Sequence, residues 1–458
     1  MAEVHVVGGG LAGSEAAFQL AERGHRVVLH EMRGVKGTAA HKTDRLAELV
    51  CSNTFKSTDE TNAHGLLKAE MRLLGSVVLE SADAARIPGG TALTVDRDIF
   101  SAGVHDRVTA HPNVRVVREE ATDLPSPGIV ATGPLTSDAL AERIRTRLGL
   151  ESLAFYDAIA PIVSAESIDR SIVFSASRYG KETLAGEGLH AAGGEGGYLN
   201  CPMEREQYEA FVAALAAADQ FTAHEFDQAP YFEGCMPIEE MARRGPDTLR
   251  FGPMKPVGLR DPRTGRRPYA VVQLRAEDRA GRMRNLVGFQ TRLRIPGQQR
   301  VFRTIPGLEN AEFLRYGSIH RNSYVNSPAA LTPHLSVRDD PLLLFAGQVT
   351  GVEGYTESTA TGLIGAINLD RLLRGEGPVL PPPTTMIGAL YRYLREADPA
   401  HFQPMNANLG LLEELPEAPR DKVQRKRRYA ERALRDLRAW AGANGVSLAS
   451  TAPGHSSV

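Results

Sequence analysis

The chain has 458 residues, which corresponds to roughly three domains at about 150 residues each. Hydrophobic residues make up 42% and charged residues 24% of the sequence, so the chain can bury a large core and is not disordered throughout. The formal net charge of -2 argues, as an average over the chain, against a nucleic-acid-binding protein.

The cysteines and the apolar runs exclude further classes of protein. Three cysteines without a C-x-x-C pair argue against a disulfide framework and against a cysteine-rich metal site, so we expect no bound metal. No apolar run reaches the roughly 18 residues that a membrane span needs. Met1 leads directly into a strand-like segment, which is not the pattern of a signal peptide. We therefore expect a soluble, cytoplasmic protein.

The first thirty residues have the pattern of a dinucleotide-binding unit. Residues 4–7 predict a buried strand, residues 14–23 a helix, and residues 26–30 a second strand that leads into Glu31. In the G-x-G-x-x-G loop between strand and helix, glycines permit a tight turn, a close approach of backbone to a pyrophosphate, and close helix packing. A carboxylate at Glu31 is placed to accept hydrogen bonds from ribose hydroxyls. The loop consists of Gly8, Gly9, Gly10, Leu11, Ala12 and Gly13.

Such a unit can bind FAD, NAD or S-adenosylmethionine, and two distant segments favour FAD. Residues 128–133 and 342–348 each predict an apolar strand, and a helix is expected over residues 357–373. The N-terminus of that helix would stabilise negative charge on a reduced flavin ring. Asp is usual where Gln348 stands, and the sequence has no second G-x-G-x-x-G for a nicotinamide cofactor. The candidate cofactor residues at these strand ends are Ala131, Thr132, Gly133, Gly347 and Gln348.

The middle of the chain is expected to be an inserted domain. Residues 203–218 predict a helix with Cys201 as a packed cap residue, and residues 270–274 and 285–291 predict strands. The Gly-rich residues 186–197 are interpreted as a flexible connector or lid. The predicted fold class is α/β, with a discontinuous Rossmann-like FAD-binding domain and a smaller inserted α+β domain. The expected boundaries are 1–199 and 332–442 for the FAD-binding domain, 200–331 for the inserted domain, and 443–458 for a disordered tail.

Basic residues are concentrated in two segments. Residues 243–303 contain 16 basic and 4 acidic residues, and residues 420–438 contain 9 basic and 3 acidic residues, so the remainder carries a net charge of -20. Only 8 of the 53 basic residues are Lys, and arginine-rich patches suit phosphate contacts. The alternatives are salt bridges to the acidic body for the first segment and a solvated helix for the second. The candidate RNA contacts in the second segment are Arg420, Lys422, Arg425, Lys426, Arg427 and Arg428.

Two cysteines have the surroundings of accessible thiols. Cys51 ends an apolar run before a polar loop, and Cys235 stands just before Pro237, where a helix is expected to begin. A helix N-terminus favours the thiolate, although most buried cysteines are inert. An FAD fold, a basic surface and such thiols suggest carbon transfer to a pyrimidine. A thiolate adds to C6 and makes C5 nucleophilic, reduced flavin supplies a hydride, and the base leaves its stack.

Segments along nearly the whole chain follow the pattern of one family. Among the most specific are GGGLAGSEAA (8–17), ELVCSN (48–53), GCMPIEE (234–240), FGPMKPVGL (251–259), GVEGYTES (351–358) and FQPMNANLGLL (402–412). In these segments the chain resembles the bacterial folate- and FAD-dependent tRNA (uracil-5-)-methyltransferases. The resemblance implies methylenetetrahydrofolate as carbon donor, FAD reduced by NADPH or NADH, and 5-methyluridine in the T-loop of tRNA as product. Small-molecule FAD oxidoreductases and flavoenzymes that modify wobble uridines remain the alternatives.

The resemblance also implies roles for single residues. Cys235 matches the thiol that attacks uracil C6, and Cys51 matches a second thiol near the flavin that accepts a proton or assists. The loop Gly8–Gly13 matches the site of the FAD pyrophosphate, and the basic C-terminal helix matches a tRNA-binding tail. The expected partners are tRNA, the folate and the nicotinamide cosubstrate, and a monomer is expected. Further family positions expected at the cofactor are Met32, Arg33, Gly354, Tyr355, Glu357 and Ser358.

Overall fold

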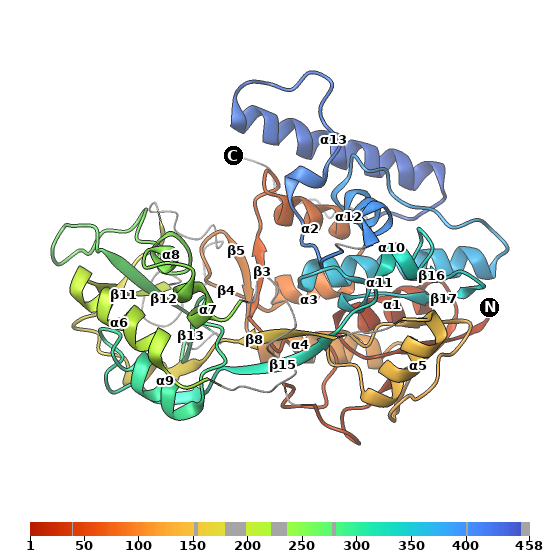
Figure 1. Cartoon of the computed structure of the whole chain (residues 1–458). Coiled ribbons are helices and arrows are strands. Elements are labelled where there is room, and N and C mark those ends of the chain that lie inside the picture. The colour runs from red at the N-terminus through yellow and green to blue at the C-terminus, as the bar shows by residue number, and fades with distance from the viewer. Residues whose placement is uncertain are drawn as a thin grey trace.

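The chain folds into two lobes that a two-stranded antiparallel ribbon connects (Figure 1). The ribbon consists of β8 (Ala154–Ile159) and β15 (Ser318–Ser323). None of the described helices is long and apolar enough to cross a membrane. The computed structural model describes residues 1–38, 40–150, 154–178, 198–220, 236–276, 281–399 and 402–449, and of residues 154–159 and 318–323 it describes the backbone alone.

The first lobe is built on a six-stranded sheet in the order β16-β17-β7-β1-β2-β6. All neighbouring strands are parallel except the edge pair β16 and β17. The central strands are buried, which explains their almost uninterrupted apolar runs, since helices cover a parallel sheet on both faces. The strands are β1 (Glu3–Val7), β2 (Arg26–Glu31), β6 (Val114–Arg118), β7 (Gly128–Val130), β16 (Ser336–Val337) and β17 (Asp340–Phe345).

Two helices that are far apart in the sequence pack closely against each other beside this sheet. A Cβ atom on Gly362 of α11 would overlap the carbonyl oxygen of Ala12 in α1, so only glycine permits the observed approach. Helix α13 lies across the outside of the lobe, over α2 and α12 (Figure 1). A small sheet of β3 (Thr54–Ser57), β5 (Ala92–Val95) and β4 (Arg86–Ile87) completes the lobe. The helices are α1 (Leu11–Glu22), α2 (Ala63–Leu73), α3 (Val77–Ala84), α4 (Arg97–Thr109), α5 (Asp138–Leu148), α10 (Ser327–Ala330), α11 (Tyr355–Leu373), α12 (Met386–Glu396) and α13 (Lys422–Ala443).

A buried carboxyl group joins two of these helices. The side chain of Glu70 in α2 accepts hydrogen bonds from the backbone N–H groups of Met386 (2.7 Å) and Ile387 (2.9 Å) at the start of α12. These N–H groups have no partner within their own helix, so Glu70 supplements the Thr385 cap, whose hydroxyl accepts from the N–H of Gly388. Burial raises the pKa of Glu70 to about 8, although both hydrogen bonds act to lower it.

The second lobe is an antiparallel α+β unit. Its six-stranded sheet has the order β10-β11-β12-β13-β9-β14, and its core includes Phe211, Phe289 and Phe302. The strands are β9 (Ile162–Ser164), β10 (Phe174–Ser175), β11 (Tyr198–Met203), β12 (Ala270–Ala276), β13 (Met283–Leu286) and β14 (Phe313–Arg315). The helices are α6 (Arg205–Ala217), α7 (Ile238–Arg243), α8 (Thr248–Phe251) and α9 (Ile295–Phe302).

The strand pairing places the start of the second lobe earlier in the sequence than the predicted boundary at residue 200. Strands β9 and β10 precede residue 200, but β9 pairs with β13 and β10 with β11, so the second sheet begins just after the ribbon. Cys201 is not a helix cap, because it lies in β11, where burial raises the pKa of its thiol. The strand expected over 285–291 ends at Leu286, and a turn follows in which Gly288 has a φ of 78°.

Two further expectations concern segments that are wholly or partly undescribed. Residues 186–197, the expected connector or lid, lie outside the described residues. Of the expected disordered tail, residues up to Ala449 are described, and the backbone N–H of Ala449 donates to the carbonyl of Leu73 at 2.8 Å. The described part of the tail therefore packs on α2, and residues 450–458 lie outside the description.

Candidate active site

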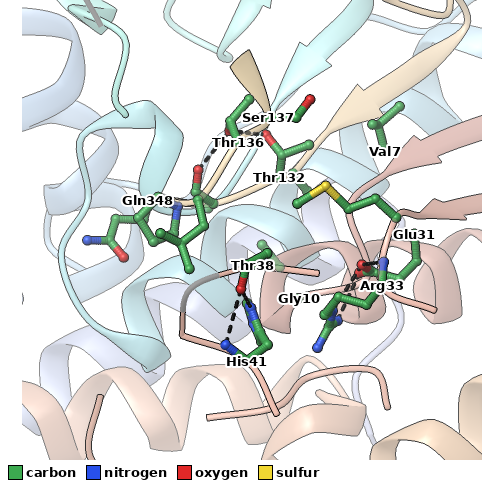
Figure 2. A pocket seen from close by; sticks show the side chains of 18 of the residues that line it. Val7, Gly10, Glu31, Arg33, Thr38, His41, Thr132, Thr136, Ser137 and Gln348 are labelled. Carbon is green, nitrogen blue, oxygen red and sulfur yellow. Dashed lines mark hydrogen bonds and ion pairs between the residues drawn. The ribbon is translucent and has the colours of Figure 1, made fainter. Parts of the chain in front are cut away.

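A pocket with about 990 Å³ of empty space opens at the carboxyl ends of β1, β2, β7 and β17 (Figure 2). This is the edge of a parallel sheet at which ligands usually bind. The pocket unites four segments that the sequence analysis identified separately. Gly9, Gly13, Gly354 and Glu357 stand next to it without lining it. The predicted cofactor residues that line it are Gly8, Gly10, Leu11, Ala12, Glu31, Met32, Arg33, Ala131, Thr132, Gly133, Gly347, Gln348, Tyr355 and Ser358.

Three glycines of the first loop have different roles in the structure. Gly8 has a φ of 100°, which a residue with a side chain rarely adopts. A Cβ atom on Gly13 would overlap the carbonyl oxygen of Gly8, so the close packing of helix on strand requires glycine there. Gly10 differs, because a Cβ atom built on it has no neighbour within 4 Å. The open side of Gly10 and the N-terminus of α1 fit the pyrophosphate of a dinucleotide.

The protein itself supplies hydrogen-bond donors to the Glu31 carboxylate (Figure 2). Its carboxylate accepts hydrogen bonds from the backbone N–H of Gly9 (2.8 Å) and of Arg33 (2.9 Å), and from Nε (2.9 Å) and Nη2 (2.8 Å) of Arg33. Burial acts to raise the pKa of Glu31, but the hydrogen bonds from Arg33 outweigh it and hold the pKa below its usual value. These four donors use all the in-plane lone pairs of the carboxylate.

The remaining guanidinium nitrogen of Arg33, Nη1, is turned toward Glu48. It is buried without a hydrogen-bond partner among the described residues and lies 3.8 Å from Oε2 of Glu48. The ion pair with Glu48 ties Arg33 to the loop that precedes Glu48. The expected ribose contact of Glu31 stays a prediction, because the oxygens of Glu31 already accept four hydrogen bonds from the protein.

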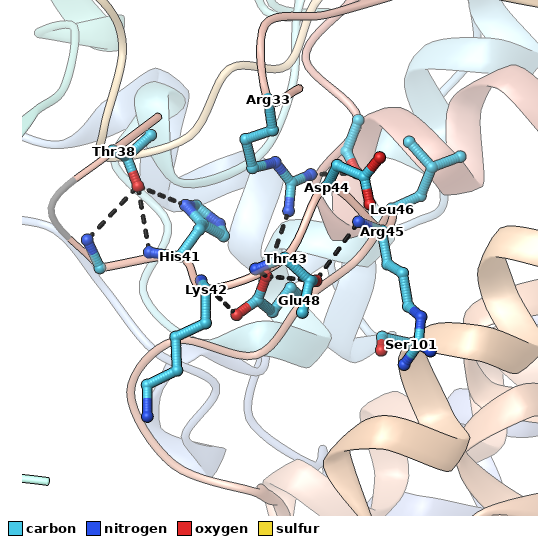
Figure 3. A network of polar contacts seen from close by, with 12 residues as sticks. Arg33, Thr38, His41, Lys42, Thr43, Asp44, Arg45, Leu46, Glu48 and Ser101 are labelled. Carbon is cyan, nitrogen blue, oxygen red and sulfur yellow. Dashed lines mark hydrogen bonds and ion pairs between the residues drawn. The ribbon is translucent and has the colours of Figure 1, made fainter. Parts of the chain in front are cut away.

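A loop that the sequence analysis did not single out forms one wall of the pocket (Figure 3). Glu48 accepts hydrogen bonds from the backbone N–H groups of Lys42 (2.8 Å) and Thr43 (2.9 Å), and from the Thr43 hydroxyl (2.7 Å). The Thr38 hydroxyl lies 2.7 Å from Nδ1 of His41, and both of these side chains line the pocket. Only Glu48, within the family segment ELVCSN, carried a sequence signal.

Cys51 lies at the edge of this pocket in a tightly held turn. The hydroxyl oxygen of Tyr355 accepts hydrogen bonds from the backbone N–H groups of Cys51 (3.0 Å) and Ser52 (3.1 Å). The Cys51 carbonyl accepts from Arg97 of the first lobe (3.0 Å) and Arg315 of the second (3.4 Å). Burial, and then the neighbouring Cys51, raise the pKa of Tyr355, which stays protonated. The turn is therefore fixed on both sides of Cys51.

Cys235 lies outside the described residues, so its predicted role as the thiol that attacks uracil C6 stays a prediction. The described residues on either side of the gap are anchored together. Nε of Arg292 donates to Gln220 at 2.7 Å, and Nη2 donates to Glu240. Glu239 also accepts from the backbone N–H of Arg292 (2.7 Å). The expected helix after Pro237 is present as α7.

The second basic segment forms one face of α13. Its apolar residues pack on the lobe, and nearly all of the candidate RNA contacts are exposed, whereas Arg425 is half-buried. Arg428 also donates to the carbonyl of Glu417 (3.3 Å). A solvated helix and an RNA-binding helix both fit this geometry, so the RNA contacts stay predictions.

Described ion pairs in the first basic segment form mainly with acids close by in the sequence. Arg292 and Arg243 pair with Glu240, Arg250 with Asp247, and Arg263 with Asp261. These pairs do not reach the acidic body of the first lobe, which was the alternative explanation for this segment. Within the described part of the chain, no group of three or more His, Cys, Asp or Glu side chains is placed to hold a metal ion.

Comparison with known proteins identifies the family. Residues 3–377 match the model of the family described as glucose inhibited division protein A. The chain belongs to this family. It is 55% identical over 439 residues to the methylenetetrahydrofolate--tRNA-(uracil-5-)-methyltransferase TrmFO of Geobacter sulfurreducens, a match that covers 95% of this chain and 98% of that protein. The protein of the same name from Desulforudis audaxviator is 54% identical over 440 residues, with the same coverage. The resemblance to the folate- and FAD-dependent tRNA methyltransferases is thereby confirmed.

A solved structure confirms the fold. Aquifex aeolicus GidA (crystal form II) matches with a TM-score of 0.70 at 17% identity, over 98% of this chain and 74% of that chain. The α/β flavoprotein architecture predicted from the sequence is therefore correct.

Proposed function

We propose that this protein converts the T-loop uridine of tRNA to 5-methyluridine, with methylenetetrahydrofolate as the carbon donor and FAD, reduced by NADPH or NADH, as the hydride source. The relatives named above support the reaction. The observation in the structure that supports the proposal is one pocket that unites the glycine loop with the N-terminus of α11, where the pocket-lining Tyr355 binds the backbone of Cys51. A tRNA substrate places the enzyme in the cytoplasm, and we expect it to act as a monomer.

The residues of the pocket fit FAD. The loop Gly8–Gly13 and the N-terminus of α1 would hold the pyrophosphate, and the adenosine end would lie beside Glu31 and Arg33, which line the pocket. Gly347, Gln348 and the N-terminus of α11 would stand at the flavin end, where the helix dipole favours negative charge. When bound and reduced, FAD supplies the hydride that turns a methylene group into a methyl group.

The chain itself supplies two thiols to this chemistry. The thiolate of Cys235 adds to C6 of uracil, which makes C5 nucleophilic toward the methylene carbon of the folate. Cys51 would take the proton that C5 loses, and the bond between the methylene carbon and the folate nitrogen would break, so that tetrahydrofolate leaves. The S–C6 bond would then break as the methylene group receives a hydride and becomes a methyl group. The fixed backbone of Cys51 holds its thiol in place for that proton transfer.

Methyl transfer to an unmodified tRNA transcript tests the proposal, with labelled methylenetetrahydrofolate and labelled S-adenosylmethionine supplied in parallel. We expect label from the folate alone, at the T-loop uridine. Label at the wobble position would indicate the wobble-uridine reaction instead. Oxidation of NAD(P)H without any transfer to tRNA would leave a small-molecule oxidoreductase as the better interpretation.

A further inference from the structure

An aromatic side chain of the second lobe stands in solvent. Phe251, the last residue of α8, is 73% exposed. A single exposed apolar residue is common on protein surfaces and has no meaning by itself. The surroundings of Phe251 decide whether it is a binding element.

The ring of Phe251 belongs to a small ordered stack. The guanidinium carbon of Arg250 lies 5.8 Å from the centroid of the Phe251 ring and 4.1 Å from that of Tyr269. Arg250 also donates from Nε to the carbonyl of Tyr269 (3.1 Å) and lies 3.5 Å from Asp247. Arg250 is therefore held in place between two rings.

The inner end of this stack is anchored in the core of the lobe. The Tyr269 ring packs edge-on against Tyr208, with 5.5 Å between centroids. The buried Tyr208 donates its hydroxyl to the carbonyl of Pro246 at 2.7 Å. The stack is therefore already ordered in the free protein, which lowers the conformational entropy that is lost when a partner binds.

The segment that carries the stack is rich in positive charge. Residues 243–269 contain eight basic and two acidic residues. Both acids, Asp247 and Asp261, are engaged with arginines of the same segment. A turn in which the backbone N–H of Lys255 donates to the carbonyl of Gly252 (3.2 Å) keeps Lys255 close to Phe251. The exposed cations of this segment include Lys255, Arg260, Arg266 and Arg267.

An exposed ring among cations matches one class of partner. Unpaired bases of RNA stack on aromatic side chains, while arginines and lysines bind the adjacent phosphates. Bases inside a duplex do not offer their faces for stacking. We infer that this surface, here called the Phe251 face, binds an unpaired nucleotide of the tRNA. The inference rests on the proposed function for the identity of the RNA, and it adds a second contact, distinct from α13.

Substitution of Phe251 tests this inference in the full-length protein with FAD bound. We expect Phe251→Ala to raise the Kd and the KM for tRNA by roughly 5- to 100-fold, the loss of one stacked base, with kcat at saturating tRNA nearly unchanged. Phe251→Trp should restore binding, because a larger ring stacks equally well, and this rescue excludes misfolding. Ile99→Ala is the control, since Ile99 is an exposed apolar residue (40%) of the first lobe. Oxidation of NAD(P)H without tRNA should be the same in all variants.

A comparison of RNA probes identifies the partner. The wild type should prefer a T-arm stem–loop over a closed duplex of equal charge, and Phe251→Ala should lose that preference. Equal tRNA binding by wild type and Phe251→Ala would refute the Phe251 face and leave the proposed function standing. Competition by polyglutamate as strong as by RNA would assign the face to an acidic protein and also refute the inference. Failure of the wild type to bind or methylate tRNA would refute the proposed function as well.

Discussion

Tyr355 offers the sharpest test of how the pocket positions Cys51. In Tyr355→Phe the only change is the loss of the hydroxyl that accepts the N–H groups of Cys51 and Ser52 at 3.0 and 3.1 Å. A buried donor left without a partner costs about 1–3 kcal/mol. Because Cys51 and Ser52 are half-buried, water can replace part of the lost contact, so we expect a fall of about 1–2 kcal/mol in the free energy of unfolding.

The substitution should also lower the rate of methylation. A freed turn no longer holds the thiol of Cys51 at the pocket edge, so kcat for methylation should fall at least about ten-fold, while the KM for tRNA stays unchanged. The rate of Cys51 alkylation, mapped by mass spectrometry, should change as well. Tyr393→Phe is the control, because it also removes a tyrosine hydroxyl that bonds to the backbone, in this case as the donor to the carbonyl of Gln403 at 2.6 Å. If Tyr355→Phe kept the wild-type kcat and alkylation rate, the positioning role would be wrong.

Four further changes have defined outcomes. Gly10→Glu should fill the open side of the loop and expel FAD, so a yellow, active variant would contradict the cofactor site. Cys235→Ala should abolish methylation with FAD still bound, and retained activity would remove Cys235 as nucleophile. Charge reversal over residues 425–428 should weaken tRNA binding and its salt dependence, whereas NAD(P)H oxidation should not change. The pKa of Glu70 rises from 4.5 unfolded to about 8 folded, so its contribution to stability is present at low pH and is lost as pH rises through this window. Relative to Glu70→Gln, the wild-type free energy of unfolding should therefore fall by on the order of 4 kcal/mol as the pH rises through this window. Equal pH profiles of the two proteins in denaturant titrations would refute a buried Glu70 carboxyl with a raised pKa.

The sequence predicted the first lobe well because its signals are local. Glycine spacing, a short strand and an acid mark the N-terminal unit, and the structure differs mainly in that α1 begins at Leu11, three residues before the expected start. Helix α11 likewise begins at Tyr355, two residues early. At both helices the first helical residue directly follows a glycine, whose flexible backbone lets the chain enter the helix at once. Each helix therefore begins before the first residue of its predicted range.

Other features could not be read from local patterns. Strands β9 and β10 have three and two residues, respectively, which is too short to show a periodicity in the sequence. The sequence therefore predicts the start of the inserted lobe too late in the chain. The contact between Arg315 and Cys51 joins residues 264 positions apart. The saturation of Glu31 by Arg33 depends on side-chain geometry that a motif does not encode. In each case a distant or side-chain contact, and not a local preference, decides the structure.

The carbonyl oxygen of Cys51 is a contact point between the two lobes. Arg97 reaches this oxygen from the FAD-binding lobe and Arg315 reaches it from the inserted lobe, so any rotation of one lobe against the other strains one of the two contacts. A shift of the inserted lobe would therefore act directly on the backbone of Cys51, which follows the pocket-lining Val50.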